Sequence, residues 1–95
     1  MFHPAKIRLF IKPFCGWCHE VIEWLNRRRI SYQTLDVTRS DVAWREMMTL
    51  SGQTRAPVIE VDGHVLADFG ATELEQWWRN KGFALPDSSS GPGSS

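Results

Sequence analysis

The segment Cys15-Gly16-Trp17-Cys18 contains both cysteines of this 95-residue chain. Before it, residues 6–11 alternate apolar and other side chains, as a half-buried β-strand does. After it, residues 19–29 carry apolar side chains at helical spacing. The sequence therefore predicts that the two cysteines stand where a strand passes into a helix.

A thiol in this position is well placed for redox chemistry. At the N-terminus of a helix it faces unpaired backbone N–H groups and the positive end of the helix dipole, which favour the reactive thiolate form. Two cysteines separated by two residues can also close a disulfide across one helical turn. The segment therefore predicts thiol–disulfide exchange.

The composition is that of one small domain without a strongly charged surface. Apolar residues make up 42% of the chain and five residues are tryptophans, which is enough for a modest core over residues 1–85. Residues 86–95 are Ser, Gly, Pro and Asp, with nothing to pack, and we expect a disordered tail there. The formal net charge is zero, so we expect neither a nucleic acid nor a membrane as a partner.

The sequence shows no targeting or membrane-spanning segment. No stretch approaches the ~20 apolar residues of a membrane span, and residues 1–14 lack the apolar region of a signal peptide. We therefore expect a cytoplasmic protein, in which two closely spaced cysteines indicate a redox or metal site. Structural zinc usually needs four protein ligands, and only three histidines could supplement the cysteines, so no metal site is predicted.

The rest of the chain predicts alternating strands and helices. The expected elements are a strand at 31–37, a helix from Ser40 or Asp41 to Leu50 that ends at Gly52, and strands at 58–61 and 65–66 joined by Asp62-Gly63. Thr72 and Glu75 have the form of a capping box, with Thr72 as N-cap, and predict a third helix that ends at Gly82. The order β-α-β-α-β-β-α predicts an α/β fold with helices on both faces of a mixed sheet.

The chain resembles the glutaredoxins, small members of the thioredoxin-fold superfamily, over roughly residues 6–85. The resemblance rests on the strand, the Cys15-Gly16-Trp17-Cys18 segment and the helix, followed about forty residues later by Thr54-Arg55-Ala56-Pro57 before another strand. It implies the thioredoxin/glutaredoxin fold, a four-stranded mixed sheet flanked by three helices. It also implies a cis Ala56–Pro57 bond against the cysteines, which proline tolerates better than other residues do.

The resemblance also implies roles for the site residues. Cys15 would be the nucleophile and Cys18 the resolving thiol of a glutaredoxin-type disulfide oxidoreductase. Attack by Cys15 on a disulfide would give a mixed disulfide, which glutathione or Cys18 then resolves. Trp17, in place of the family's usual tyrosine, would offer an apolar lip to the substrate. The expected partners of such a monomer are glutathione, as the reductant, and disulfide-containing proteins.

Glutathione would be held at both of its carboxylates. The resemblance places the glycyl carboxylate near Lys12 and Arg55, and it pairs the cysteinyl backbone with Ala56. The γ-glutamyl carboxylate would lie at the start of the third helix, near Thr72 and Glu73, where free backbone N–H groups bind anions.

One departure from the family pattern leaves the electron donor open. Typical glutaredoxins have two glycines before the third helix, whereas this chain has Ala67-Asp68-Phe69-Gly70. Asp68 places a negative charge where a carboxylate should dock, and together with Phe69 it resembles redoxins that are reduced by thioredoxin reductase. Two alternatives to a glutathione-dependent enzyme therefore stay open. One is a redoxin reduced by thioredoxin reductase, and the other is a dimer that holds a [2Fe–2S] cluster through one cysteine per chain and glutathione.

Overall fold

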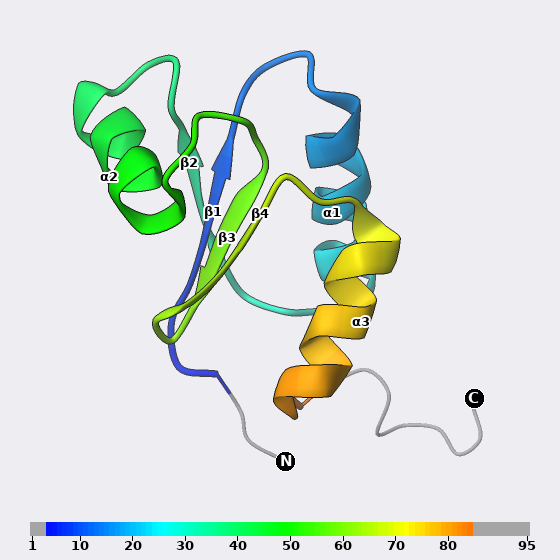
Figure 1. Ribbon diagram of the computed structural model, residues 1–95. Helices are drawn as coiled ribbons and strands as arrows, with labels where there is room; N and C mark the ends of the chain where they lie inside the picture. Colours follow the sequence, from blue (N-terminus) through cyan, green and yellow to red (C-terminus); the bar gives the residue numbers. More distant parts are fainter. Residues whose placement is uncertain (1–3, 85–95) are drawn as a thin grey trace.

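A four-stranded sheet in the order β2-β1-β3-β4 forms the centre of the computed structural model, which describes residues 4–84 (Figure 1). Along the chain the elements are β1 (Ile7–Ile11), α1 (Gly16–Arg27), β2 (Gln33–Asp36), α2 (Asp41–Ser51), β3 (Val58–Val61), β4 (His64–Ala67) and α3 (Ala71–Lys81). The predicted order of elements and the thioredoxin/glutaredoxin fold, with a four-stranded mixed sheet and three helices, are confirmed. The tail predicted at 86–95 lies outside the described residues.

The sheet is mixed because the two halves of the chain pair in different directions. β1 and β2 run parallel, with Leu9 opposite Thr34, as a strand–helix–strand unit requires. β3 runs antiparallel to both β1 and β4. Asp62 and Gly63, which join β3 to β4, have positive φ angles of 49° and 90°, as a tight two-residue hairpin turn demands. The predicted hairpin is therefore confirmed.

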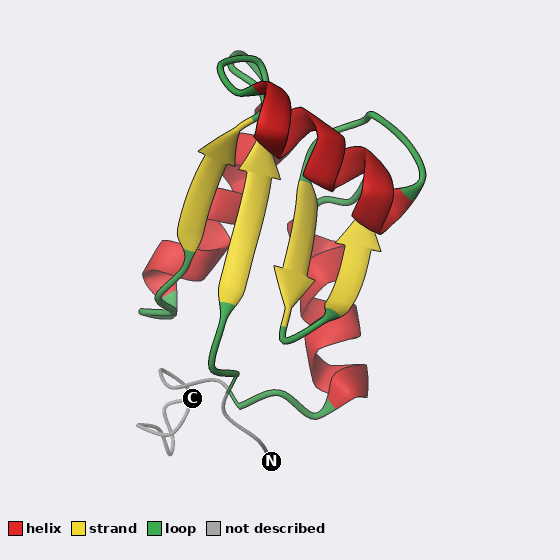
Figure 2. Ribbon diagram, turned by 90° about the vertical axis from the view of Figure 1, so that its left-hand side faces the viewer, coloured by secondary structure: helices red, strands yellow, loops and turns green. Residues whose placement is uncertain are grey.

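Helices cover both faces of the sheet (Figure 2). α1 and α3 pack on one face around a cluster that includes Leu9, Trp24 and Trp78, whereas α2 packs on the other face around Phe10 and Met47. Neighbouring residues of a strand point to opposite faces, so Leu9 and Phe10 are both fully buried but belong to different clusters. Within residues 4–84, none of the helices has the length and apolar character needed to cross a membrane.

The first two helices begin where their sequences predict. Cys15 is the N-cap of α1 and Gly16 its first residue, so the cysteine segment does form the passage from strand to helix. At α2 the Ser40 hydroxyl accepts a hydrogen bond from the backbone N–H of Ala43 at 3.1 Å, and Gly52 ends the helix with a φ of 71°.

The capping box predicted at Thr72 is wrong, because α3 begins two residues earlier. Its N-cap is Gly70, whose backbone N–H donates to the Glu73 carboxylate at 3.0 Å. Glu75, the residue expected to close the box, pairs instead with Arg79 at 3.1 Å. The cap that forms is thus the local pair Gly70 and Glu73, three residues apart, and a carboxylate from α1 binds the next backbone N–H of α3 in addition.

Candidate active site

Cys15 stands at the N-terminus of α1 with its side chain partly exposed. Its Sγ atom accepts a hydrogen bond from the backbone N–H of Cys18 at 3.3 Å and lies 3.9 Å from the carbonyl oxygen of Ala56. The chain enters this turn through Phe14, which has a positive φ of 59°. The sulfur therefore faces both the first turn of α1 and the loop before β3.

Cys18 lies one helical turn further along and is only 1% exposed. Burial and the hydrogen bond with Cys15 raise the pKa of the Cys18 thiol to about 12, although Lys12 acts in the opposite direction. The Cys18 thiol is therefore protonated at neutral pH. Both cysteines are free, so the structure holds the dithiol form. One accessible sulfur and one protected sulfur within a turn suit two successive steps of disulfide exchange.

Pro57 joins the loop before β3 to the sheet. The Ala56–Pro57 peptide bond is cis, as predicted, and Pro57 is fully buried. The Pro57 carbonyl oxygen accepts a hydrogen bond from the backbone N–H of Asp68 at 3.0 Å, which extends the pairing of β3 and β4 toward the cysteines. This pairing holds Ala56 next to Cys15.

The two cations expected to bind one carboxylate of glutathione have separate partners. Lys12 Nζ donates to the carbonyl oxygen of Thr54 at 2.7 Å and lies 5.2 Å from the centre of the Trp44 ring, which belongs to α2. Arg55 forms an ion pair with Asp68 at 3.2 Å, and both side chains are more than half exposed. The structure therefore brings Arg55 and Asp68 together, and it bonds Lys12 to the backbone of Thr54, the residue before Arg55.

The start of α3, where the second carboxylate was expected, is occupied by carboxylates of the protein itself. Glu73 accepts from the backbone N–H of Gly70, and Glu20 of α1 accepts from that of Ala71, each at 3.0 Å. Thr72 lies exposed at the second position of the helix. Sequence analysis missed Glu20, because its partner is 51 residues away and no local motif signals the contact.

Trp17 packs against Gly70 and so links α1 to the start of α3. A Cβ atom on Gly70 would lie only 2.5 Å from the Trp17 ring and 3.0 Å from the Glu20 carboxylate. The lack of a side chain at Gly70 is therefore what allows the ring to lie there. Trp17 is still 58% exposed, so much of its indole faces solvent next to the cysteines.

A pocket of about 170 Å³ lies beside the Trp17 ring. It is lined by Trp17, Asp68, Phe69, Gly70 and Glu73. Because Asp68 is hydrogen-bonded to Pro57, this pocket adjoins the loop that contacts the Cys15 sulfur.

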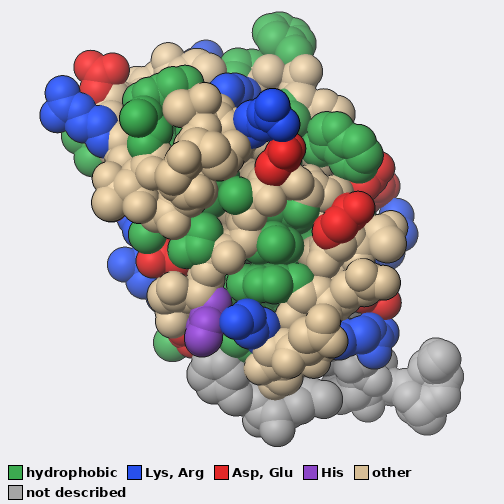
Figure 3. Space-filling view, in the orientation of Figure 1, with side chains coloured by type: hydrophobic (Ala, Val, Ile, Leu, Met, Phe, Trp, Pro, Cys, Tyr) green, Lys and Arg blue, Asp and Glu red, His purple; other side chains and the backbone are tan. Residues whose placement is uncertain are grey.

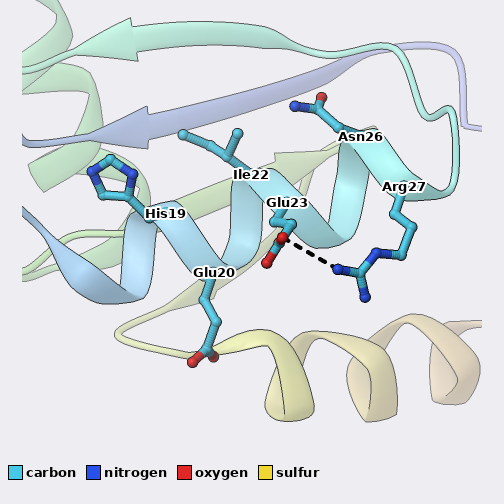
Figure 4. Close-up of a pocket in the computed structure, with 6 residues that line it drawn as sticks. All are labelled: His19, Glu20, Ile22, Glu23, Asn26 and Arg27. Atoms are coloured by element: carbon cyan, nitrogen blue, oxygen red, sulfur yellow. Dashed lines mark ion pairs between the residues drawn. The ribbon is translucent and has the colours of Figure 1, made fainter.

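The outer face of α1 carries a wider and more open hollow (Figure 4). It is lined by His19, Glu20, Ile22, Glu23, Asn26 and Arg27. Glu23 pairs there with Arg27 at 3.2 Å, whereas Glu20 points away from them toward the segment that leads into α3. Of these lining residues, Glu20 is the one that binds the start of α3.

Hydrophobic side chains flank the accessible sulfur. Phe14, directly before Cys15, is fully exposed, and Trp17 follows two residues after it. Sequence analysis singled out Trp17 and missed Phe14, whose exposure depends on the backbone turn at its own position. Exposed aromatic side chains at this place offer an apolar surface to a docking protein.

Side chains that ligate metals are dispersed in the described part of the chain. Within residues 4–84, no group of three or more His, Cys, Asp or Glu side chains is arranged to hold a metal ion. Cys15 is the accessible cysteine, so the shared [2Fe–2S] cluster considered above would use this residue from each of two chains.

The comparisons with known proteins all find glutaredoxin-like or thioredoxin-like proteins. A family model described as glutaredoxin matches residues 7–66. An uncharacterised glutaredoxin-like 8.6 kDa protein from the rubredoxin operon of Clostridium pasteurianum is 30% identical over 70 residues, covering 74% of this chain and 93% of that protein. Glutaredoxin 3 of Escherichia coli K12 is 29% identical over 58 residues, covering 61% of this chain and 70% of the relative. The crystal structure of the thioredoxin-like protein BC3987 has a TM-score of 0.69 at 28% identity, covering 75% of this chain and 97% of that one.

Proposed function

Because the chain belongs to the glutaredoxin family of thiol–disulfide oxidoreductases, we propose that it reduces protein disulfides through Cys15 and Cys18. The observation that carries this proposal is the pairing, within one helical turn, of a partly exposed Cys15 with a Cys18 that is 1% exposed. An accessible sulfur can attack a substrate, and a protected sulfur can resolve the intermediate without reacting first.

The proposed exchange takes place in two steps. The Cys15 thiolate attacks one sulfur of the substrate disulfide, the substrate S–S bond breaks, and the departing sulfur takes up a proton. Cys18 then loses its proton as its sulfur attacks Cys15, which forms the Cys15–Cys18 disulfide and releases the second substrate thiol. The substrate gains two electrons, and the dithiol of the protein loses two.

We further propose that a protein dithiol, such as that of thioredoxin reductase, rather than glutathione restores the reduced form. Sequence analysis favours glutathione because two cations and a helix start match its two carboxylates. In the structure, however, Arg55 pairs with Asp68 and Lys12 donates to a backbone carbonyl. Two glutamates bind the first N–H groups of α3. Both cations and the first N–H groups of α3, which were expected to bind the carboxylates of glutathione, thus already have partners within the protein. This supports an electron donor that is a protein and does not need these groups.

A paired turnover assay tests both parts of the proposal. The oxidised protein is supplied with NADPH and either thioredoxin reductase or glutathione with glutathione reductase, and NADPH oxidation is followed with a disulfide-bonded protein as substrate. We expect turnover with thioredoxin reductase to exceed turnover with millimolar glutathione. Faster turnover with glutathione would return the assignment to a glutathione-dependent enzyme, and no turnover with either donor would contradict disulfide reduction itself.

The colour of the purified protein tests the iron–sulfur alternative, because a brown preparation would indicate a [2Fe–2S] cluster and a colourless one would favour disulfide exchange. The cytoplasmic location, the monomeric state and the lack of nucleic-acid or membrane partners stay predictions from the sequence.

A further inference from the structure

We propose that Glu20 is a specificity-determining residue, which makes the pocket beside Cys15 favour disulfides next to a basic side chain and disfavour those next to a carboxylate. The expected occupant of the pocket is thus an arginine or lysine of the substrate protein, close in sequence to its disulfide. This inference rests on the proposed disulfide reduction, and it adds the class of substrate.

Glu20 connects the helix of the cysteines to the start of α3. Its carboxylate accepts from the backbone N–H of Ala71 at 3.0 Å, and Figure 4 shows its side chain leaving α1 in that direction. A free N–H group at a helix start would attract an incoming carboxylate. With Glu20 bound there, and with Glu73 on the preceding N–H of Gly70, an anionic substrate group meets two negative charges instead.

The charges around the pocket favour a cation. Asp68 and Glu73 line it, and the Arg55 guanidinium pairs with Asp68. The Glu20 carboxylate lies beside the lining residue Gly70, where it would be 3.0 Å from an added Cβ atom. Three carboxylates and one guanidinium therefore surround the pocket. Lys12 is bonded instead to the carbonyl oxygen of Thr54 and lies over the Trp44 ring of α2. In Figure 3, acidic and hydrophobic side chains lie next to each other on the face where α1 meets the start of α3. The pocket therefore carries an excess of negative charge.

The shape of the pocket suits a long basic side chain. Its volume is about 170 Å³, and the Trp17 indole, pressed against Gly70, forms one wall. The face of an indole attracts ammonium and guanidinium groups. Asp68 pairs with Arg55 at 3.2 Å, but both side chains are more than half exposed, so a guanidinium of the substrate would have to share the Asp68 carboxylate with Arg55 or displace it.

The position of the pocket identifies its occupant as the substrate. A substrate must bring its disulfide to the Cys15 sulfur, which lies 3.9 Å from the Ala56 carbonyl oxygen. The next residue, Pro57, is hydrogen-bonded to Asp68 of the pocket. A chain spans about 3.5 Å per residue, so we expect a side chain one or two positions from the substrate cysteine to reach this neighbouring pocket.

The test compares two peptide dimers, each joined by one disulfide and identical except for arginine or glutamate next to the cysteine. Fully reduced protein is mixed with each dimer under single-turnover conditions, the reaction is quenched with acid, and the released thiol is counted by chromatography. No electron donor is needed, so the result is independent of the choice between glutathione and thioredoxin reductase. For the wild type at low salt, we expect the arginine dimer to react roughly tenfold faster, since two exposed charge contacts change from favourable to unfavourable.

The Glu20→Gln variant removes the charge of Glu20 and keeps an oxygen that can accept from Ala71. We expect it to lower the arginine-to-glutamate rate ratio by about threefold, within the range of one exposed charge contact. Asp68→Asn, on the other side of the pocket, should lower the ratio in the same direction. Glu23→Gln is the matched control, because Glu23 lies one turn further along α1 and pairs with Arg27. It should keep the wild-type ratio.

The outcomes separate the inference from the proposed function. Equal rates for the two dimers in the wild type, or an equal fall of the ratio in Glu20→Gln and Glu23→Gln, would overturn the role of Glu20 while leaving disulfide reduction intact. No reaction with either dimer would overturn the proposed function and this inference with it. A ratio that falls toward one in about 1 M salt, where charges are screened within a few ångströms, would support it.

Discussion

The start of α3 lies beside α1, and the first turns of the two helices are bonded by different chemical groups (Figure 1). At α1 the backbone N–H of Cys18 donates to the Cys15 sulfur at 3.3 Å. At α3 two backbone N–H groups donate to the carboxylates of Glu73 and Glu20, each at 3.0 Å. Both helix starts offer the same unpaired donors. A sulfur partner leaves a group that can react, whereas the carboxylate partners occupy two of the donors and place negative charge where another anion would bind.

The largest effect should come from removing the sulfur at the start of α1. Cys15→Ser should lower disulfide reduction on the order of a thousandfold or more, because a serine hydroxyl is a far weaker nucleophile than a thiolate at neutral pH. Stopped-flow reduction of a peptide disulfide by the pre-reduced protein measures this loss. Substantial activity in the Cys15→Ser protein would show that the α1 start is not the reactive one.

The matched variant is Cys18→Ser, which keeps the accessible sulfur and removes the protected one. It should still attack the substrate but stop at the mixed disulfide, which intact-protein mass spectrometry detects as one substrate chain bound to Cys15. Added dithiothreitol should release that chain. A Cys18→Ser protein that completes the exchange unaided would contradict the resolving role.

The buried Cys18 thiol should react only in strongly alkaline solution. The pKa of Cys18 is raised to about 12, mainly by burial, so its thiol is protonated below that pH and forms thiolate only in strongly alkaline solution. Iodoacetamide at pH 8 should therefore modify Cys15 and leave Cys18 unmodified, as peptide mapping can establish. In the Cys15→Ser protein, Cys18 should become reactive only as the pH approaches its pKa. Modification of Cys18 at pH 8 in the folded protein would contradict its protection.

Each helix start has a glycine, and the two glycines should respond differently to an added methyl group. Gly70 has an extended φ of −114°, but its Cβ would lie 2.5 Å from the Trp17 ring, so Gly70→Ala should cost about 1–3 kcal/mol of unfolding free energy. At Gly16 a Cβ would meet no atom within 4 Å. Gly16→Ala should therefore be neutral or stabilise by up to about 1 kcal/mol. Urea denaturation measures both changes.

A double-mutant cycle tests whether the cost arises at the tryptophan. In a Trp17→Ala background the ring is absent, so Gly70→Ala should cost less than it does in the wild type. The same cost in both backgrounds would place the clash elsewhere.

The parts of the fold that sequence patterns predicted correctly depend on local information. The strand within residues 6–11, the Asp62-Gly63 turn and the Ser40 cap each involve residues close in the chain, and each is confirmed. The expected half-buried character of that strand is wrong, because helices cover both faces of the sheet and both Leu9 and Phe10 are fully buried. The start of α3 was predicted two residues late because the Thr72–Glu75 pair was chosen as the cap, whereas the equally local pair of Gly70 and Glu73 caps the helix. Glu20, from another helix, binds the next N–H of the same turn. Periodicity and capping motifs contain no information about such a contact.

The candidate site also has features that the sequence predicts and features that it does not predict. The cysteine segment and Pro57 could be found from the sequence, because their spacing resembles a known family and the cis bond follows from that resemblance. The pairing of Arg55 with Asp68 could not be found, since it joins a loop to the end of a hairpin. That pairing changes the expected chemistry, because it engages the cation that was assigned to glutathione.

The smallest expected change is in the free energy of unfolding, when the cap of α3 is altered. The test compares substitutions at two neighbouring residues, Thr72 and Glu73. If Thr72 were the N-cap, as its sequence context predicts, Thr72→Ala would cost about 1 kcal/mol. In the structure Glu73 binds the first N–H of the helix at 3.0 Å, and Thr72 is an exposed residue of the first turn. Glu73→Ala should therefore cost about 1 kcal/mol, from the lost hydrogen bond and the lost charge at the positive end of the helix dipole. Thr72→Ala should stay within about 0.5 kcal/mol of the wild type.

Urea denaturation at low and high salt distinguishes the two contributions at Glu73, because salt weakens the dipole interaction more than the hydrogen bond. A larger loss for Thr72→Ala than for Glu73→Ala would restore the cap predicted from the sequence, and with it a start of α3 that is open to anions.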